Sequence, residues 1–251
     1  MCMHLQTVQA SALRSIFEVL KDIINDVNIY FTSEGIKILT LDTAHVTLVH
    51  MALPAENFEE YSCPSDIIAG INLSNMYKLL KSVSNSDSLR MKIDKRHEVL
   101  EIEIWNTVKN SSTQFHLKLL DINEDDLIVP DLQMDSVTTL PSIDFQRITR
   151  DMANLATDIS IIRRGPILEL SCQGDFADQK TEIVCHPTTT QENEPVIGGI
   201  YSLKYINLYT KATNLCSSVQ LFQHENLPLI IRYSIGNLGD VKFYLAQKTE
   251  T

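Results

Sequence analysis

Apolar residues recur along the chain with two different periods, and these periods predict helices and strands in turn. Spacings of three and four, as in Leu13, Ile16 and Leu20, predict an amphipathic helix. Asn72 or Ser74 is a candidate N-cap for a second helix of this kind. Helices are predicted over roughly 10–26, 73–83, 142–155 and 202–212.

Between these helices the period is two, which is typical of strands with one buried face. The first two strands flank Thr32-Ser33-Glu34-Gly35, which predicts a hairpin turn. Each half of the chain has a strand, a helix, a hairpin, further strands, a second helix and final strands, so we infer an internal duplication. Strands are predicted over 29–31, 36–41, 46–53, 89–93, 100–104, 115–119, 137–140, 158–162, 167–172, 181–184, 219–222, 229–235 and 241–245.

Residues 121–135 interrupt this pattern with six acidic residues, no Lys or Arg, and one proline. Leu127-Ile128-Val129 forms an apolar island inside this acidic segment. A chain of 251 residues can form one large domain or two of about 125 residues. We therefore expect an N-terminal domain over 1–120, an interdomain connector over 121–135 and a C-terminal domain over 136–251.

The composition argues against several classes of protein. A hydrophobic fraction of 44% suffices for a packed core, which excludes global disorder. No apolar run approaches the ~20 residues that span a bilayer, and the N-terminus carries no secretory signal, so no membrane partner is expected. The five cysteines are scattered and form no CxxC pair, which favours free thiols over disulfides or a zinc site.

The net charge is −11, from 21 Lys and Arg against 32 Asp and Glu. A basic stripe within an acidic protein can still attract nucleic acid, because DNA responds to the local field. The predicted helices carry cations opposite their apolar residues, although any amphipathic helix in water does the same. If the helices share one surface, that surface can contact DNA phosphates without reading sequence. The candidate DNA-binding residues are Arg14, Lys21, Lys78, Lys81, Arg147, Arg150, Lys204 and Lys211.

The sequence carries no recognisable catalytic motif. Neither GxxxxGK[ST] nor GxGxxG occurs, so phosphate-cradle chemistry has no support. Glu101 and Glu103 are spaced like paired carboxylates, although a solvated strand face explains them equally. The acids between 121 and 126 fit no EF-hand loop, and Cys185-His186 lacks further ligands nearby. We therefore expect no enzyme activity, no catalytic residue, no cofactor and no metal.

Several segments resemble the proliferating cell nuclear antigen family, the sliding clamps of DNA replication. The resemblance runs in order from about Leu5 to Lys248, which is almost the whole chain. The segments that carry it are LDTAHVTLV at 41–49 followed by Phe58, GINLSNMYKLLK at 70–81, KLLDI at 118–122, FQRITRD at 145–151, TKAT at 210–213 and YLAQK at 244–248.

The resemblance implies an α+β DNA clamp fold with two similar domains per subunit, each with β-sheet and two helices. Three subunits would close head to tail into a ring whose helices line a central hole. Such a homotrimer would encircle double-stranded DNA without sequence preference and act as a processivity factor for DNA polymerase in replication and repair. Its expected partners are duplex DNA, further copies of itself, DNA polymerase, the clamp loader and proteins with a Gln-x-x-aliphatic-x-x-aromatic-aromatic motif.

In this family, the partner motif enters an apolar pocket beneath the connector. His45, one of the matching positions, fits packing or a hydrogen bond better than metal binding. The subunit interface should pair an edge strand near 114–119 with one near 180–184 of the next subunit. The candidate interface residues are Phe115, Leu117, Glu182 and Ile183. The candidate pocket residues are Leu41, His45, Val46, Leu48, Leu127, Ile128, Val129, Pro228, Tyr244, Leu245 and Ala246.

Two positions depart from the family pattern. Gln247 follows Ala246 where eukaryotic clamps usually have proline, so contacts between the tail and partners should differ. Arg163-Arg164-Gly165 stands where eukaryotic clamps carry a modifiable lysine, which argues against ubiquitin or SUMO attachment there. A subunit of a heterotrimeric checkpoint or replication clamp is the alternative function. The expected location is the nucleus for a eukaryotic source, and the cytoplasm or a viral replication site for an archaeal or viral one.

Overall fold

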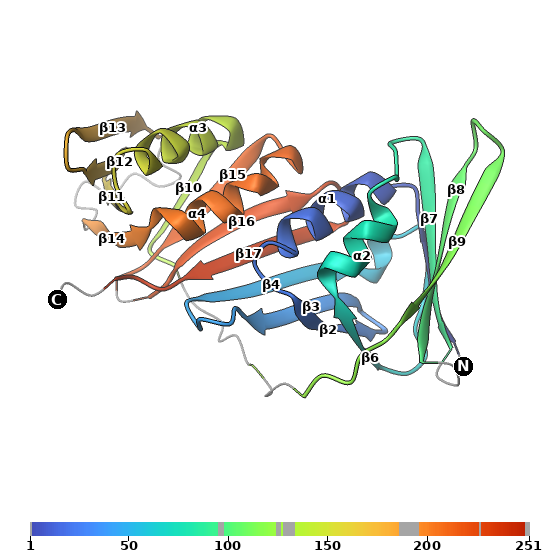
Figure 1. Cartoon of the computed structure of the whole chain (residues 1–251). Coiled ribbons are helices and arrows are strands. Elements are labelled where there is room, and N and C mark those ends of the chain that lie inside the picture. Colours follow the sequence, from blue (N-terminus) through green and yellow to red (C-terminus); the bar gives the residue numbers. More distant parts are fainter. Residues whose placement is uncertain are drawn as a thin grey trace. The chain divides into compact units, whose positions relative to one another are not determined.

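The computed structural model describes residues 2–94, 98–123, 127, 134–185, 196–225 and 227–248. The chain forms two compact units, and each is described here by itself. The N-terminal unit comprises Met1–Thr43, Val49–Ile128 and Ser234–Val241. The C-terminal unit comprises Ala44–Leu48, Val129–Tyr233 and Lys242–Thr251. Figure 1 labels their helices and strands along the chain.

The N-terminal unit combines a five-stranded antiparallel sheet, in the order β5-β1-β7-β8-β9, with a second run of neighbouring strands, β4-β3-β2-β6. Helices α1 and α2 pack against each other (Figure 1). The elements are β1 (Cys2–Thr7), α1 (Ala10–Leu20), β2 (Asp26–Thr32), β3 (Gly35–Leu41), β4 (Thr47–Pro54), a 3₁₀ turn (Ala55–Asn57), β5 (Glu60–Ser62), β6 (Ile67–Asn72), α2 (Leu73–Leu80), β7 (Asp87–Asp94), β8 (Val99–Asn106) and β9 (Ser111–Lys118).

The core of this unit lies where its helices and its two sets of strands meet. On β7, Leu89, Met91 and Ile93 are buried while Arg90 and Lys92 are exposed, as the period of two predicts. Each fully buried apolar side chain of this kind contributes about 1.5–3 kcal/mol. One small interior space is lined by Leu13, Phe17, Ile29, Phe31, Ile36, Met51, Leu53, Ile71, Met76, Met91 and Leu100.

The C-terminal unit repeats this plan with a four-stranded sheet, β13-β12-β11-β14, and a second run of neighbouring strands, β10-β15-β16-β17. In its core the rings of Tyr209 and Phe243 stack with centroids 4.5 Å apart. The elements are β10 (Ser136–Pro141), α3 (Ser142–Ala153), β11 (Asp158–Arg164), β12 (Ile167–Gln173), β13 (Asp178–Val184), β14 (Ile197–Ser202), α4 (Leu203–Tyr209), a 3₁₀ turn (Thr210–Asn214), β15 (Ser218–Gln223), β16 (Leu229–Ile235) and β17 (Gly239–Leu245).

The same backbone joint occurs once in each unit. The amide of Leu73, the first residue of α2, donates to the carbonyl of Asn25 at 2.8 Å. The amide of Leu203, the first residue of α4, donates to the carbonyl of Thr157 at 3.0 Å. Each accepting residue directly precedes the strand that follows the unit's first helix. The inferred duplication is therefore confirmed at the level of individual hydrogen bonds.

Three helices end earlier than the sequence pattern predicts, at Leu20, Leu80 and Ala153, and α4 gives way to a 3₁₀ turn after Tyr209. After α1 the amide of Ile23 donates to Leu20, three residues back, so the last turn tightens. Ile24 is nevertheless buried. The apolar spacing therefore continues through a turn that is no longer α-helical. The predicted N-cap is confirmed, because the Asn72 side chain accepts a 2.9 Å hydrogen bond from the amide of Asn75.

The sequence pattern missed β1, β5, β6 and β14. Two of these strands contain small residues that carry no apolar side chain: Gly70 in β6, and the Gly198-Gly199 pair in β14. The division of the chain at 120 and 135 stays a prediction.

A late segment of the chain belongs to the N-terminal unit. The carbonyl of Leu238 accepts a 3.1 Å hydrogen bond from the side-chain amide of Asn57. The amide of Asn237 donates to the Gln9 side-chain oxygen at 2.8 Å. Residues 234–241 therefore help to complete a unit that begins at the N-terminus.

Candidate functional site

Arg14 and Lys21, two of the candidate DNA-binding residues, are engaged within the N-terminal unit. Arg14 Nη1 donates to the carbonyl oxygen of Val83 at 2.6 Å, and the side chain is half-buried. Lys21 Nζ lies 2.7 Å from Asp22 Oδ1 and 5.1 Å from the ring centre of Tyr77. Arg14 thus links α1 to the loop after α2.

Tyr77, which the sequence analysis did not single out, links the two helices of this unit. Its hydroxyl donates to Glu18 Oε1 on α1 at 2.8 Å. This hydrogen bond to a carboxylate raises the pKa of Tyr77 above its ordinary value. The contact stabilises the negative charge of Glu18 on the same helix pair as the cations. Its sequence signal is weak, because a tyrosine on the polar side of a helix has many possible roles.

Lys78 and Lys81 are both exposed. Lys78 Nζ contacts the side-chain oxygen of Asn75 at 3.2 Å. Lys81 has no ion-pair partner among the described residues. Ammonium groups of this kind can follow a phosphate backbone without fixed geometry.

The helices of the C-terminal unit carry the other four candidate cations. Arg147 pairs with Asp144 one turn earlier at 3.3 Å, with both side chains largely exposed. Arg150 is exposed and pairs with no acid in the part of the chain that the structure describes. Lys204 lies 5.7 Å from the ring centre of Tyr205, and Lys211 is exposed on the 3₁₀ turn. That all eight cations contact DNA stays a prediction.

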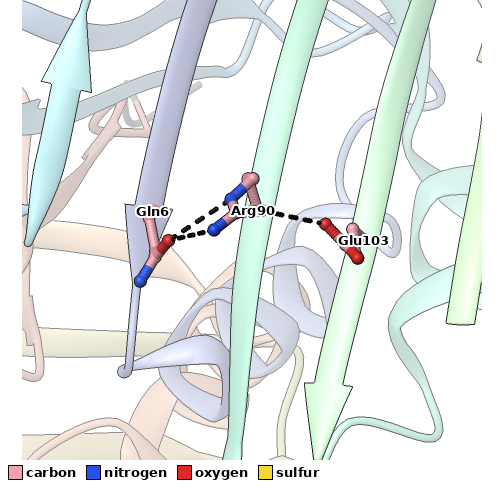
Figure 2. Close-up of polar contacts among 3 residues, drawn as sticks. All are labelled: Gln6, Arg90 and Glu103. Carbon is pink, nitrogen blue, oxygen red and sulfur yellow. Dashed lines mark hydrogen bonds and ion pairs between the residues drawn. The ribbon is translucent and has the colours of Figure 1, made fainter. Parts of the chain in front are cut away.

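On the outer face of the five-stranded sheet, Arg90 is balanced locally (Figure 2). Arg90 donates to the Gln6 side-chain oxygen from Nε at 3.3 Å and from Nη2 at 2.8 Å. Its Nη1 lies 3.2 Å from Glu103 Oε2. Such exposed pairs contribute about 0–1 kcal/mol to stability, but they cancel charge. Glu103 is therefore a paired surface residue, as the solvated-face explanation predicted.

The two candidate interface strands are both sheet edges within their own units. β9 ends the order β5-β1-β7-β8-β9, and β13 ends the order β13-β12-β11-β14. Phe115, Leu117 and Ile183 are half-buried on these edges. An uncovered strand edge offers unpaired backbone groups to another chain. Their pairing between subunits stays a prediction.

Glu182 takes part in a charged cluster on the face of β13. Lys180 Nζ lies 2.9 Å from Glu182 Oε1 and 2.9 Å from Glu169 Oε2. Hydrogen bonds to these two carboxylates raise the pKa of Lys180, and the bond from Lys180 lowers the pKa of Glu169. The carboxylate of Glu182 therefore already has a partner within its own subunit.

The candidate pocket residues differ strongly in exposure. His45 and Ala246 are exposed, whereas Tyr244 is 8% exposed and Leu245 is completely buried. Leu245 can therefore support a pocket wall but offers no surface to a partner. The remaining described positions, Leu41, Val46, Leu48, Leu127 and Pro228, are half-buried. Ile128 and Val129 lie outside the described residues.

Part of this set comes together within the C-terminal unit. The amide of Ala246 donates to the carbonyl of Val46 at 3.2 Å, which joins the loop around His45 to the C-terminal tail. His45 has a positive φ of 56°, an uncommon conformation for a residue other than glycine. Pro228 and Ala246 also line one groove of about 780 Å³.

The start of the connector is fixed to the N-terminal unit. The amide of Leu120 donates to the carbonyl of Gly70 at 2.8 Å, and Asn28 donates from its side chain to the carbonyl of Ile122 at 3.0 Å. A Cβ at Gly70 would lie 2.2 Å from the Leu120 carbonyl oxygen. Glycine is therefore required at this position, and the sequence hint was a glycine inside an otherwise apolar strand.

Within the described part of the chain, no group of three His, Cys, Asp or Glu side chains is placed to hold a metal ion. None of the described helices is both long and apolar enough to cross a bilayer. Cys63, Cys172, Cys185 and Cys216 are free thiols, as predicted. Glu124, Asp125, Asp126 and His186 lie outside the described residues.

Two repeated α+β units, each with a pair of helices and β-sheet, define the architecture of a DNA clamp. Comparison with known families agrees with it. Residues 2–127 match the family model "Proliferating cell nuclear antigen, N-terminal domain", and residues 128–248 match "Proliferating cell nuclear antigen, C-terminal domain". The chain therefore belongs to the proliferating cell nuclear antigen family.

Two curated proteins are similar to almost the whole chain. "Probable DNA polymerase sliding clamp 1" of Paramecium bursaria Chlorella virus 1 is 36% identical over 256 residues, covering 97% of this chain and 95% of that protein. "Proliferating cell nuclear antigen" of Chaetomium thermophilum is 31% identical over 247 residues, covering 96% of this chain and 95% of that protein. The resemblance identified from short sequence segments is confirmed.

Proposed function

We propose that the chain is a DNA sliding clamp that encircles duplex DNA and holds DNA polymerase on it. The observation that carries this proposal is the match of both units, in order, to the two domains of the proliferating cell nuclear antigen family. The name "DNA polymerase sliding clamp" of a relative covered over 95% of its length supports the same function. A clamp of this kind is a scaffold, so we propose no catalytic role for the chain.

The proposed assembly is a closed ring of three copies. The exposed edges of β9 and β13 support it, because a ring in which these edges pair leaves neither edge open. The proposed DNA contacts are made by cations on the helices, with Lys81 and Arg150 as the least encumbered of them. Contact with phosphates alone would hold the ring loosely, so that it can slide.

The proposed docking function uses the segments around Leu41, His45, Leu127, Pro228 and Tyr244. A partner peptide with a Gln-x-x-aliphatic-x-x-aromatic-aromatic motif would bury its aromatic side chains there. Two buried aromatic anchors can supply affinity in the micromolar range, about −8 kcal/mol, after ordering costs. DNA polymerase and the clamp loader are the proposed carriers of such a motif.

Threading onto DNA provides the decisive test, because a ring needs a free DNA end when no loader is present. One end of a linear duplex is fixed to a bead, and the other end is left open or blocked with streptavidin. We expect retention only on open duplexes, and no loss of retained protein when the end is blocked after threading. Equal retention on blocked and open duplexes would indicate ordinary surface binding and refute the proposal.

The alternative is a subunit of a heterotrimeric clamp, and light scattering of the isolated chain separates the two. A homotrimer has three times the 28.4 kDa mass of one chain, about 85 kDa. A stable 28.4 kDa monomer would favour the heterotrimer. The clamp would then act wherever the DNA is replicated, in the nucleus of a eukaryote, the cytoplasm of an archaeon or a viral replication site.

A further inference from the structure

The C-terminal tail, residues 246–248, forms one side of a groove within the C-terminal unit. The groove has a volume of about 780 Å³ and includes Ile200 on β14 and Pro228 before β16. β14 is an edge strand of its four-stranded sheet. The tail runs along this edge, because the amide of Lys248 donates to the carbonyl of Ile200 at 2.8 Å.

The tail is held at both ends. At one end the amide of Ala246 donates to the carbonyl of Val46 at 3.2 Å. At the other end Lys248 Nζ lies 2.5 Å from Asp158 Oδ1, on the strand that neighbours β14. This ion pair also balances the charge of Lys248. The tail therefore gives the groove a fixed wall without a net charge.

Between these two anchors, the side chain of Gln247 lies directly against Gly199. A Cβ at Gly199 would lie 2.3 Å from Gln247 Nε2 and 2.4 Å from its Cδ. Glycine therefore leaves the space that the Gln247 side chain occupies. The carboxamide of Gln247 lines the groove and has no hydrogen-bond partner among the described residues.

We propose that Gln247 is a specificity-determining residue, whose carboxamide hydrogen-bonds the main chain of a partner's extended, uncharged segment in this groove. A carboxamide offers both a donor and an acceptor, which matches a peptide group and no simple anion. Gly199 and Asp158 are positioning residues, since the first makes room for the side chain and the second anchors Lys248. The inference rests on the proposed docking function, because Pro228 and Ala246 line the same groove.

The test is calorimetry with a synthetic peptide that has a four-alanine flank before Gln-x-x-Leu-x-x-Phe-Phe. Gln247→Ala should weaken binding about three- to ten-fold, the range for one neutral hydrogen bond. Gly199→Ala should weaken binding similarly, because the added methyl group displaces the carboxamide. The double variant should bind no more weakly than either single variant, since both changes remove the same hydrogen bond. Gln173→Ala, an exposed glutamine on β12 outside the groove, is the matched control and should bind like wild type.

The outcomes separate this inference from the function on which it rests. If wild type does not bind the peptide, the docking function fails and the inference fails with it. If wild type binds and Gln247→Ala binds equally well, the inference alone is overturned. Additive losses in the double variant would show that Gly199 does not act through Gln247. The exposed position of Gln247 keeps the test open even if Gly199→Ala folds poorly.

Discussion

Arg14 Nη1 donates a 2.6 Å hydrogen bond to the main-chain carbonyl of Val83, and this contact ties α1 to the loop that follows α2. An arginine on the polar side of a helix can face a ligand or brace its own fold. Here the guanidinium is half-buried and bound to backbone, so bracing is its first role. This contact separates Arg14 from the exposed cations of the same predicted set.

We predict that Arg14→Met lowers the free energy of unfolding by about 1–2 kcal/mol, since it removes a partly buried, charged hydrogen bond. Methionine keeps most of the apolar stem, so the loss reports the hydrogen bond rather than packing. Urea unfolding provides the measurement. A change below about 0.5 kcal/mol, the scatter expected of surface substitutions, would contradict the bracing role.

Charge reversal at Lys81 and Arg150 should weaken binding to duplex DNA. For every phosphate that the variant no longer neutralises, the slope of log affinity against log salt should flatten by about 0.9. The matched control reverses Lys37 and Lys92, which are exposed on strands and change the net charge equally. The salt slope of each double variant is measured on the same duplex. Equal slopes for both would show that net charge, and not the helix surface, governs DNA affinity.

Replacing Leu117 or Ile183 by Asp should convert the proposed ring into monomers. Each change places a charge on a sheet edge that would have to pair with another subunit. Light scattering measures the mass of each variant. Ile68→Asp is the control, because Ile68 is 62% exposed and lies outside the predicted interface. If the Leu117 and Ile183 variants both remain trimeric, the interface prediction is wrong.

Substituting Leu127 and Ile128 by Ala should reduce affinity for the Gln-x-x-Leu-x-x-Phe-Phe peptide on the order of ten-fold or more. The apolar island then loses most of the surface on which aromatic anchors can bury. Assembly should be unchanged, since neither residue lies on β9 or β13. Calorimetry with wild type and the double variant gives both affinities. Equal values would place the docking site elsewhere.

Gly70→Ala should detach the start of the connector from β6. The new methyl group would sit 2.2 Å from the carbonyl oxygen of Leu120, a backbone atom that cannot rotate away. We expect a loss of about 1–3 kcal/mol, as for other overpacked sites, and faster proteolysis within the connector. Unchanged stability together with unchanged cleavage would mean that the strand shifts at no cost.

The sequence predicted the repeated helices and most strands, because their apolar residues follow a simple period. It missed β14, where Gly198 and Gly199 leave no apolar signal, and it extended α1 through a turn in which Ile24 stays buried. The cations were found by type and position. Their engagement was not predictable, because Arg14 and Val83, or Lys248 and Asp158, are distant in sequence and meet only in the fold.

The late segment that includes Asn237 and Leu238 has a consequence for the protein as it leaves the ribosome. The N-terminal unit needs residues 234–241, so it stays incomplete while the whole C-terminal unit up to Tyr233 is synthesised. At about 5–20 residues per second, translation from Ile128 to Val241 takes on the order of ten seconds. During this delay the residues around Gln9 and Asn57 wait for partners that have not yet been made. The first half to emerge is therefore among the last parts of the protein to finish folding.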